Sequence, residues 1–277
     1  MSVSLTFHWT TSAPGGDAGW VRVGTLTLDG KPMISTANCS DKASHRAALW
    51  SPVAFFEDNS WFMTYVAYDC PRNIDGQIKL TKSTVPGPGG ISGPYASSAV
   101  PGCPGCRPGV LLARGADGGN ASQPWESIQG VDSFFAFHAP TPVAARSGRA
   151  AAAAAAAVAP PPPPPPLLAF YGSSRFGWPW NVGLAASSSG KIGGPWVRLP
   201  HGNPLAIDGG KTENPIVIEV TAPAAAAASG STAEAAKGSS NSTSMLLMLH
   251  DWVTDGAKGF GMTWSLDGIT CRHPSGV

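Results

Sequence analysis

Charged residues are scarce in this chain of 277 residues: 13% are Asp, Glu, Lys or Arg, and the formal net charge is +1. The chain therefore carries no basic field that would attract nucleic acid or an anionic membrane, and no acidic run that would attract a basic partner. Long apolar runs are also missing. The one long uncharged stretch, 150–168, contains a proline run that cannot satisfy its backbone as a membrane helix. We expect a monomer with neutral or small partners, no nucleic acid and no membrane.

Cysteine is sparse and irregularly spaced, with five residues that form no recognisable disulfide framework. Cys103 and Cys106 have a spacing that occurs in metal and redox sites, but no second such pair is present. A loop disulfide or free thiols is the interpretation, and no metal or other cofactor is predicted. The first residues, 1–6, lack the basic and apolar regions of a signal peptide. The compartment is left open, with secretion as an option if an upstream signal sequence is missing from this chain.

What is present is a series of short segments in which apolar and polar residues alternate, which predicts β-strands. After a first pair of strands, at 2–10 and 19–24, three groups of three strands follow. They cover 49–56, 61–68 and 77–83; then 131–138, 167–172 and 181–187; and last 215–220, 245–252 and 259–265. A Gly-Pro-aromatic closure follows each of the first two groups, as Gly93-Pro94-Tyr95 and Gly194-Pro195-Trp196.

The first strands of the three groups begin at a constant spacing. From Ser51 to Asp132 and from Asp132 to Glu213 it is 81 positions (132 − 51 and 213 − 132). Repeats of this length, built from small antiparallel sheets with no helical period between them, indicate a β-propeller. In a propeller the first strand of each blade lines the central channel, so these three residues should meet at one face.

Two low-complexity tracts interrupt the repeats, an Ala/Pro tract at 141–166 and an Ala/Ser/Gly tract at 221–244. Both fall between the first and second strands of a group, at the face opposite to the starts of the first strands. They have too few bulky apolar side chains to offset the entropy of ordering them, so we expect disordered inserts in one domain that spans 1–277.

Glu213 is the first candidate for a reacting group, because it stands immediately before Asn214-Pro215 and an apolar, β-branched strand. A glutamate at the rim of a sheet is held on stiff backbone. The alternative is a solvated turn residue beside an Asn-Pro break. Aromatic side chains that could stack on the apolar face of a sugar are Trp50, Trp178 and Trp180, with core packing as their alternative use.

These motifs resemble the five-bladed propeller glycoside hydrolases, above all the arabinanase and β-xylosidase group, family 43, with the invertase and levansucrase group as a relative. Trp50-Ser51-Pro52 is similar to the Trp-Ala-Pro that opens a blade in that group. The resemblance implies that Glu213 is the general acid and that Asp132 orients and tunes it, in an inverting cleavage of a polysaccharide or oligosaccharide. It places the base aspartate upstream of Met1, so the fold expected here is a partial propeller of about three to four blades.

Two rival interpretations follow from the missing base: a carbohydrate-binding propeller without catalysis, or a fragment of a longer gene product. Asp29 and Asp41 are weaker candidates for the base, because loop positions without a strand are not fixed. His138 and His250 are interpreted as core or rim residues, since no second histidine lies at metal-ligand spacing. We expect the chain as written to have no glycosidase activity or very little.

Overall fold

The structure of the protein is a computed structural model. Five cysteines, Asp41, Trp178 and most of both low-complexity tracts lie outside the residues that it describes, so the predictions on thiols and inserts stay predictions. The described residues are 6–10, 20–33, 48–69, 74–98, 109–114, 123, 125–126, 130–139, 166–174, 180–200, 203–205, 207, 211–222, 243–254, 257–266, 268 and 270.

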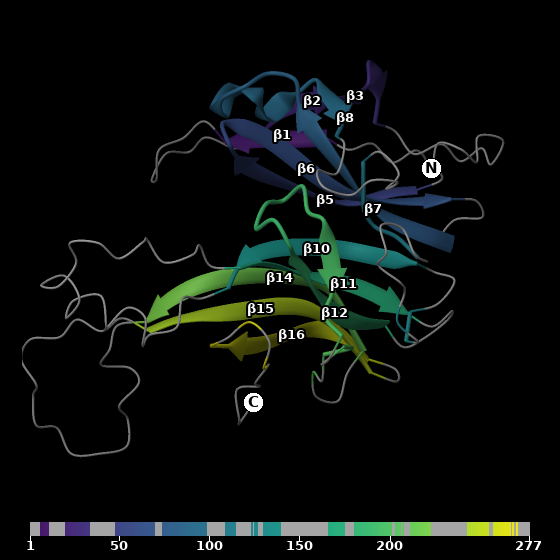
Figure 1. Ribbon diagram of the computed structural model, residues 1–277, viewed down its shortest axis with the longest axis vertical. Helices are drawn as coiled ribbons and strands as arrows, with labels where there is room; N and C mark the ends of the chain where they lie inside the picture. Colours follow the sequence, from purple (N-terminus) through teal and green to yellow (C-terminus); the bar gives the residue numbers. More distant parts are fainter. Residues whose placement is uncertain are drawn as a thin grey trace, which may run out of the picture.

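Within these ranges the chain is built from strands, with one short 3₁₀ helix (Figure 1), and the prediction of an all-β protein is confirmed. The strands are β1 (Thr6–Thr10), β2 (Trp20–Thr25), β3 (Thr27–Leu28), β4 (Lys31–Pro32), β5 (Ala48–Glu57), β6 (Ser60–Asp69), β7 (Ile74–Ser83), β8 (Tyr95–Ser97), β9 (Val110–Leu112), β10 (Val131–His138), β11 (Leu167–Ser174), β12 (Trp180–Ser187), β13 (Trp196–Arg198), β14 (Lys211–Ala222), β15 (Thr243–Thr254) and β16 (Ala257–Ser265), and the helix is η2 (Pro88–Ser92).

Each predicted group of three strands forms consecutive antiparallel neighbours in one sheet. The first sheet has the order β4-β3-β8-β7-β6-β5, with β9 on β7; the second is β10-β11-β12-β13; the third is β14-β15-β16. The strands β1 and β2 form a separate pair. The short strands β3, β4, β8, β9 and β13 were not predicted as strands, because two or three residues carry no recognisable alternation.

The closures of the first two sheets have the same construction. In both, a cis Gly-Pro bond precedes an aromatic residue whose polar group donates to the carbonyl four residues earlier: Tyr95 Oη to Ile91 at 2.7 Å and Trp196 Nε1 to Ile192 at 2.9 Å. In both, the residue after the strand donates its N–H to the proline carbonyl at 2.9 Å, from Thr84 and from Ser188. The repeat expected from the sequence is therefore present in the backbone.

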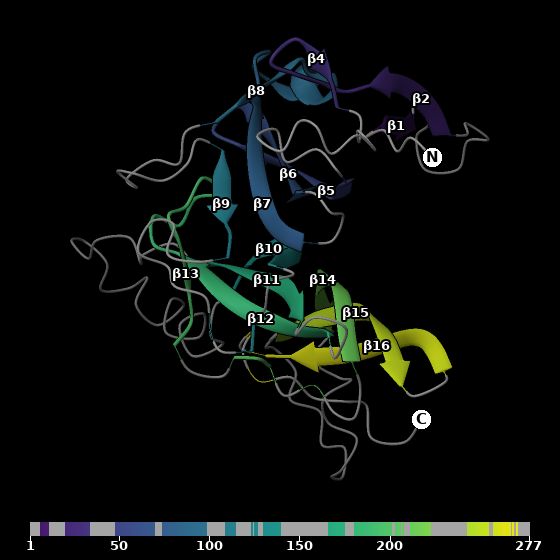
Figure 2. The same cartoon turned by 90° about the vertical axis from the view of Figure 1, so that its right-hand side faces the viewer.

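The sheets pack on one another in chain order through two apolar clusters (Figure 2). One cluster joins β6 and β7 of the first sheet to β10 and β11 of the second, and includes Val66, Ile78 and Phe134. The other joins β10 to β12 with β14 and β15 of the third, and includes Phe170 and Met248. The first strand of the second sheet, β10, contacts both β5 and β14. This is the arrangement of a partial propeller, with the first strands innermost.

The third sheet differs from the prediction at one place. Thr221, Ala222, Thr243 and Ser244, which the sequence assigned to the second insert, pair with one another at the end of β14 and β15. Apolar side chains also cover an open face of this sheet, where Ile216 is 53% exposed and Phe260 is 91% exposed. Among the described residues, no helix is long and apolar enough to cross a membrane.

Candidate functional site

One backbone irregularity recurs in the innermost strand of each sheet. The pairing register shifts after Trp50 in β5, after Asp132 in β10 and after Glu213 in β14. The next residue in each strand has a left-handed backbone, with φ of 49° at Ser51, 44° at Ser133 and 50° at Asn214. A non-glycine residue in this region costs about 1–3 kcal/mol, and such residues gather at functional sites.

These β-bulges show which residues of the three strands are equivalent, and they move the residue chosen from the sequence in the first strand by one position. Ser51 matches Ser133 and Asn214, while Trp50 is the residue that matches Asp132 and Glu213. The bulge also explains the prolines. Pro215 is the fifth residue of β14 rather than its first, and it is tolerated because it falls where the ladder is interrupted. Glu213 is thus a half-buried strand residue and not a solvated turn residue.

Asp132 is almost completely buried, at 3% exposed. Burial raises the pKa of its carboxyl, while the Tyr68 hydroxyl and a hydrogen bond from the backbone N–H of Ser133, at 2.6 Å, act in the opposite direction. Among the residues that the structure describes, no cation offsets its charge. A buried carboxyl held by neutral donors alone is biased towards its protonated form.

Tyr68 links Asp132 to Trp50. Its ring meets the indole of Trp50 edge-on, with the ring centroids 5.0 Å apart, and its hydroxyl lies near enough to the Asp132 carboxyl of the neighbouring sheet to lower that carboxyl's pKa. Two of the predicted site residues, Trp50 and Asp132, are therefore brought together, although they lie in different sheets. Trp50 is half-buried, which leaves part of the indole open to a ligand.

The bulge at Asp132 depends on a glycine in the next strand. Asp132 pairs with Gly172 in β11. A Cβ at Gly172 would lie 2.8 Å from Ser133 Oγ and 2.9 Å from the Asp132 carbonyl oxygen, which is closer than real side chains pack. The glycine thus leaves the space into which the bulge folds.

Glu213 has its own partners in the third sheet. It pairs directly with Asp251 of β15, and the Asn214 amide donates to Asp251 Oδ2 at 2.9 Å. Residues opposite each other on antiparallel strands place their side chains on the same face, so a second carboxylate lies beside Glu213. His250, 2% exposed, contacts the Asp251 carbonyl oxygen through Nδ1 at 3.1 Å and fills the space left by Gly261.

The other predicted residues are placed as follows. Trp180 is half-buried at the start of β12, opposite Ser174, and lies towards the same end of the second sheet as Asp132. Asp29 was a weaker candidate for the base; it accepts hydrogen bonds from the N–H of Ser97 at 3.0 Å and its hydroxyl at 2.7 Å, and so has a structural role. Asp132 and Glu213 lie on adjacent innermost strands, and their shared cleft stays a prediction.

Sequence reasoning missed Tyr68, Asn214 and Asp251. Asp251 could have been found by pairing the predicted strands 215–220 and 245–252 as a hairpin, because the register then sets it opposite Glu213. Tyr68 had no such signal, since its contact with Asp132 crosses between two sheets. Within the described part of the chain, no group of three His, Cys, Asp or Glu side chains could hold a metal ion.

A second buried carboxylate, Glu126, has a different environment. Arg198 of β13 donates to it through Nε at 2.7 Å and through Nη2 at 2.8 Å, and the two side chains are 2% and 0% exposed. The Tyr171 hydroxyl donates to Glu126 at 2.8 Å, and burial followed by the Glu126 charge raises the pKa of Tyr171. Every strong charge in this cluster is paired, which is typical of a structural role.

Comparison with known proteins finds solved structures that are similar to this chain, but no family that matches its sequence. No protein-family profile matches the chain, and no curated protein matches its sequence. Similar solved structures include a family 117 glycoside hydrolase of the marine bacterium Zobellia galactanivorans, with a TM-score of 0.38 and 12% identity over 81% of this chain. This chain spans 45% of the length of that protein.

Two further structures have the same character. An endo-arabinase from Bacteroides thetaiotaomicron has a TM-score of 0.32 and 12% identity, with 88% of this chain and 81% of that one covered. A thermostable family-43 glycoside hydrolase has a TM-score of 0.34 and 15% identity, with 92% and 82% covered. These structures are glycoside hydrolases of the kind that the sequence motifs resemble.

Proposed function

We propose that this protein acts on the glycosidic bonds of a neutral oligosaccharide or polysaccharide, with Glu213 as proton donor and Asp132 as the carboxyl that tunes it. The observation that supports this most is the repeated bulge. It sets an aromatic residue and two carboxyls, Trp50, Asp132 and Glu213, at equivalent points of three neighbouring innermost strands, each before a left-handed residue. Pairing of the strands does not by itself require a left-handed residue at the same point of all three strands.

The two carboxyls are suited to different tasks by their exposure. At 3% exposed, Asp132 is too enclosed to touch a substrate, so it acts through its neighbours and is a positioning residue. Glu213 is half-buried and can reach a bound sugar. A carboxyl at the substrate that is kept protonated near neutral pH is what glycoside cleavage requires of its acid.

In the proposed reaction the Glu213 carboxyl passes its proton to the glycosidic oxygen while the bond from that oxygen to the anomeric carbon breaks. Water attacks the anomeric carbon from the other side of the sugar ring and gives a proton to a base carboxylate. No residue in the described part of the chain is assigned as this base. Trp50 offers the apolar face of its indole to the sugar ring.

The test compares two substrates that differ only in their need for the acid. The full chain is assayed on arabino- and xylo-oligosaccharides and on the matching dinitrophenyl glycosides, whose leaving group departs without a proton. Formate is added in a parallel series as an external base. We expect Glu213→Gln to lower kcat/KM on the oligosaccharides by roughly 100- to 10,000-fold and to affect the dinitrophenyl glycosides far less.

The matched control is Glu219→Gln, an exposed carboxylate on the same strand, which should change neither rate. Equal losses on both substrates would show that Glu213 is not the proton donor. If neither substrate is cleaved with or without formate, the catalytic proposal fails. Titration calorimetry with the same oligosaccharides then tells whether the rival function, carbohydrate binding without catalysis, holds.

A further inference from the structure

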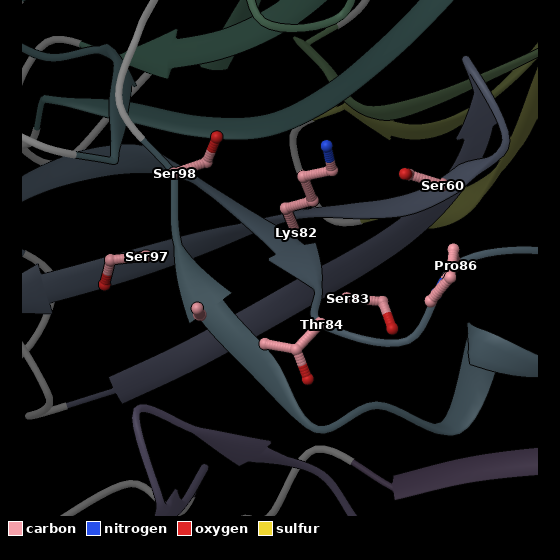
Figure 3. Close-up of a pocket in the computed structure, with 8 residues that line it drawn as sticks. Ser60, Lys82, Ser83, Thr84, Pro86, Ser97 and Ser98 are labelled. Carbon is pink, nitrogen blue, oxygen red and sulfur yellow. The ribbon is translucent and has the colours of Figure 1, made fainter.

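A hollow of about 550 Å³ opens on the first sheet, away from the bulges, among β6, β7, β8 and the segment that follows β7 (Figure 3). Its volume lies within the range of small-molecule sites, which is about 300–1,000 Å³. Hydroxyl groups and one ammonium group supply its polar lining, and no residue of the candidate site is among them. The lining residues include Ser60, Lys82, Thr84, Pro86, Ala96 and Ser98.

Among the described residues that line the hollow, Lys82 is the one charged residue. Its ammonium lies over the ring of Phe62, 5.4 Å from the centroid, and forms no ion pair with a carboxylate of the described residues. Figure 3 shows the Lys82 side chain extending between Ser60 and Ser98, with the Ser60 hydroxyl directed towards it. The cation is therefore presented to the hollow.

Ser60 contributes a hydroxyl group to the same hollow. The residue is 7% exposed, and its hydroxyl is directed towards the Lys82 side chain (Figure 3). The hydroxyl and the ammonium group can therefore contact the same ligand in the hollow.

The carboxylates on neighbouring segments are engaged elsewhere. Asp58 pairs with Lys191, and Glu57 accepts the backbone N–H of Ile192 at 3.3 Å. Asp29 is held by Ser97, whose hydroxyl points away from the Lys82 ammonium in Figure 3. A ligand anion would thus meet Lys82 without displacing an internal partner.

The walls of the hollow are fixed by hydrogen bonds that do not involve Lys82. Trp61 Nε1 donates to the Pro88 carbonyl at 2.8 Å, and the N–H of Gly87 donates to the Asn59 carbonyl at 2.8 Å, which ties the hairpin beside Ser60 to η2. A preformed wall lowers the ordering cost of binding.

The second sheet shows that the closure itself does not require this lysine. Lys82 pairs with Phe62, and the corresponding pair in the second sheet is Ala186 with Leu168. Ser83 and Ser187, the next residues, pair with the aromatic residues of the two closures. The same turn therefore forms with alanine in place of Lys82, so the charge is not explained by the turn.

We propose that this hollow binds a small anionic sugar, with its acidic group on Lys82 and a hydroxyl group on Ser60. An ammonium group binds a carboxylate or a sulfate through charge-assisted hydrogen bonds, and the hydroxyl lining suits the remaining hydroxyl groups of a sugar. The site is separate from Asp132 and Glu213 and does not depend on the function proposed for them.

The test titrates the full chain with galacturonate, galactose 6-sulfate, neutral galactose and inorganic sulfate, and follows backbone amide shifts. We expect an acidic sugar to bind with a Kd on the order of a millimolar and to move the amides of Ser60, Lys82 and Ser98. Lys82→Met should weaken binding about tenfold while keeping its stem on Phe62, and Ser60→Ala about threefold. Galactose should bind at least tenfold more weakly than its acids.

Lys31→Met is the matched control, since Lys31 is an exposed lysine of the same sheet outside the hollow, and it should leave Kd unchanged. The two acidic sugars together distinguish a carboxylate from a sulfate as the preferred group. The proposal is overturned if inorganic sulfate binds as tightly as both, if neither binds, or if Lys82→Met leaves Kd unchanged. Glu213→Gln should not alter this Kd, so failure here is distinct from failure of the proposed catalysis.

Discussion

Glu126 and Asp132 are both buried carboxylates at the second sheet, and their surroundings are opposite. Glu126 meets the guanidinium of Arg198 and the hydroxyl of Tyr171, so its charge is matched. Among the described residues, Asp132 has only neutral polar neighbours, the Tyr68 hydroxyl and the Ser133 N–H. Burying a charge without a counter-charge disfavours the charged form, and burial correspondingly raises the pKa of Asp132. Glu126 therefore stabilises the fold as a charged group, whereas the charged form of Asp132 destabilises it.

The largest effect is expected when the matched pair is broken. Arg198→Met should leave Glu126 buried without its cation and lower the free energy of unfolding by about 3–5 kcal/mol, as is found when one partner of a buried ion pair is removed. Urea denaturation measures this. Lys191→Met, which removes an exposed ion pair with Asp58, should have little effect. Equal losses in the two variants would contradict a structural role for the Arg198–Glu126 pair.

A smaller loss is expected from Gly172→Ala, which closes the space for the bulge at Asp132. The new Cβ would meet Ser133 Oγ and the Asp132 carbonyl oxygen, so the strand must shift, at about 1–3 kcal/mol. The same substitution at Gly259, where no atom lies within 4 Å, should be close to neutral. If Gly172→Ala is as mild as Gly259→Ala, the bulge does not depend on the glycine.

Asp132→Asn should act in the other direction, and only at some pH values. Because the folded-state pKa of Asp132 lies above its ordinary value of 3.8, the folded chain binds the proton more tightly. The free energy of unfolding of the natural chain then falls as pH rises from the ordinary pKa through the folded-state pKa, by about 1.4 kcal/mol for each pH unit between these two pKa values. Asparagine does not ionise, so the variant should be the more stable one above that range and equal below it.

The pH dependence of the unfolding midpoint, measured for both chains, checks this prediction. A variant that is less stable than the natural chain at every pH would mean that the Asp132 charge is stabilising, as it is for a matched carboxylate. Glu126→Gln provides the contrast, since it should be destabilising at neutral pH.

The smallest effect is expected from a change in the Ala/Ser/Gly tract, which contains neither of the two carboxylates. Shortening 223–242 to a Gly-containing loop of half its length should raise the free energy of unfolding by only about 0.6 kcal/mol, because closure entropy depends weakly on loop length. The deletion keeps Thr221, Ala222, Thr243 and Ser244, which pair at the end of β14 and β15. A collapse of the unfolding midpoint would show that the tract is part of the fold.

The sequence was informative wherever the signal is local. Alternation located the strands at 131–138 and 61–68 to within two residues, because adjacent residues of a strand face opposite sides of the sheet. The Gly-Pro-aromatic repeats located both closures. The spacing of 81 aligned Asp132 with Glu213 correctly but chose Ser51 in place of Trp50, since alternation does not show where a bulge inserts a residue.

Contacts between sheets were beyond the sequence. Arg198 and Glu126 are 72 positions apart, and no periodic pattern joins them. Tyr68 reaches Asp132 only because the first and second sheets pack together around Val131 and Ile78. Such contacts depend on how the sheets are set against each other, and this depends on many side chains at once.

The central claim, that Asp132 and Glu213 share one cleft, is tested most directly by titrating the Asp132 carboxyl with ¹³C NMR in the natural chain, in Glu213→Gln and in Glu219→Gln. We predict that Asp132 titrates above its ordinary value in the natural chain, that its pKa falls in Glu213→Gln because a nearby negative charge has been removed, and that Glu219→Gln leaves it unchanged. An Asp132 pKa that is the same in all three chains would contradict the shared cleft, and with it the pairing of these two carboxyls in catalysis.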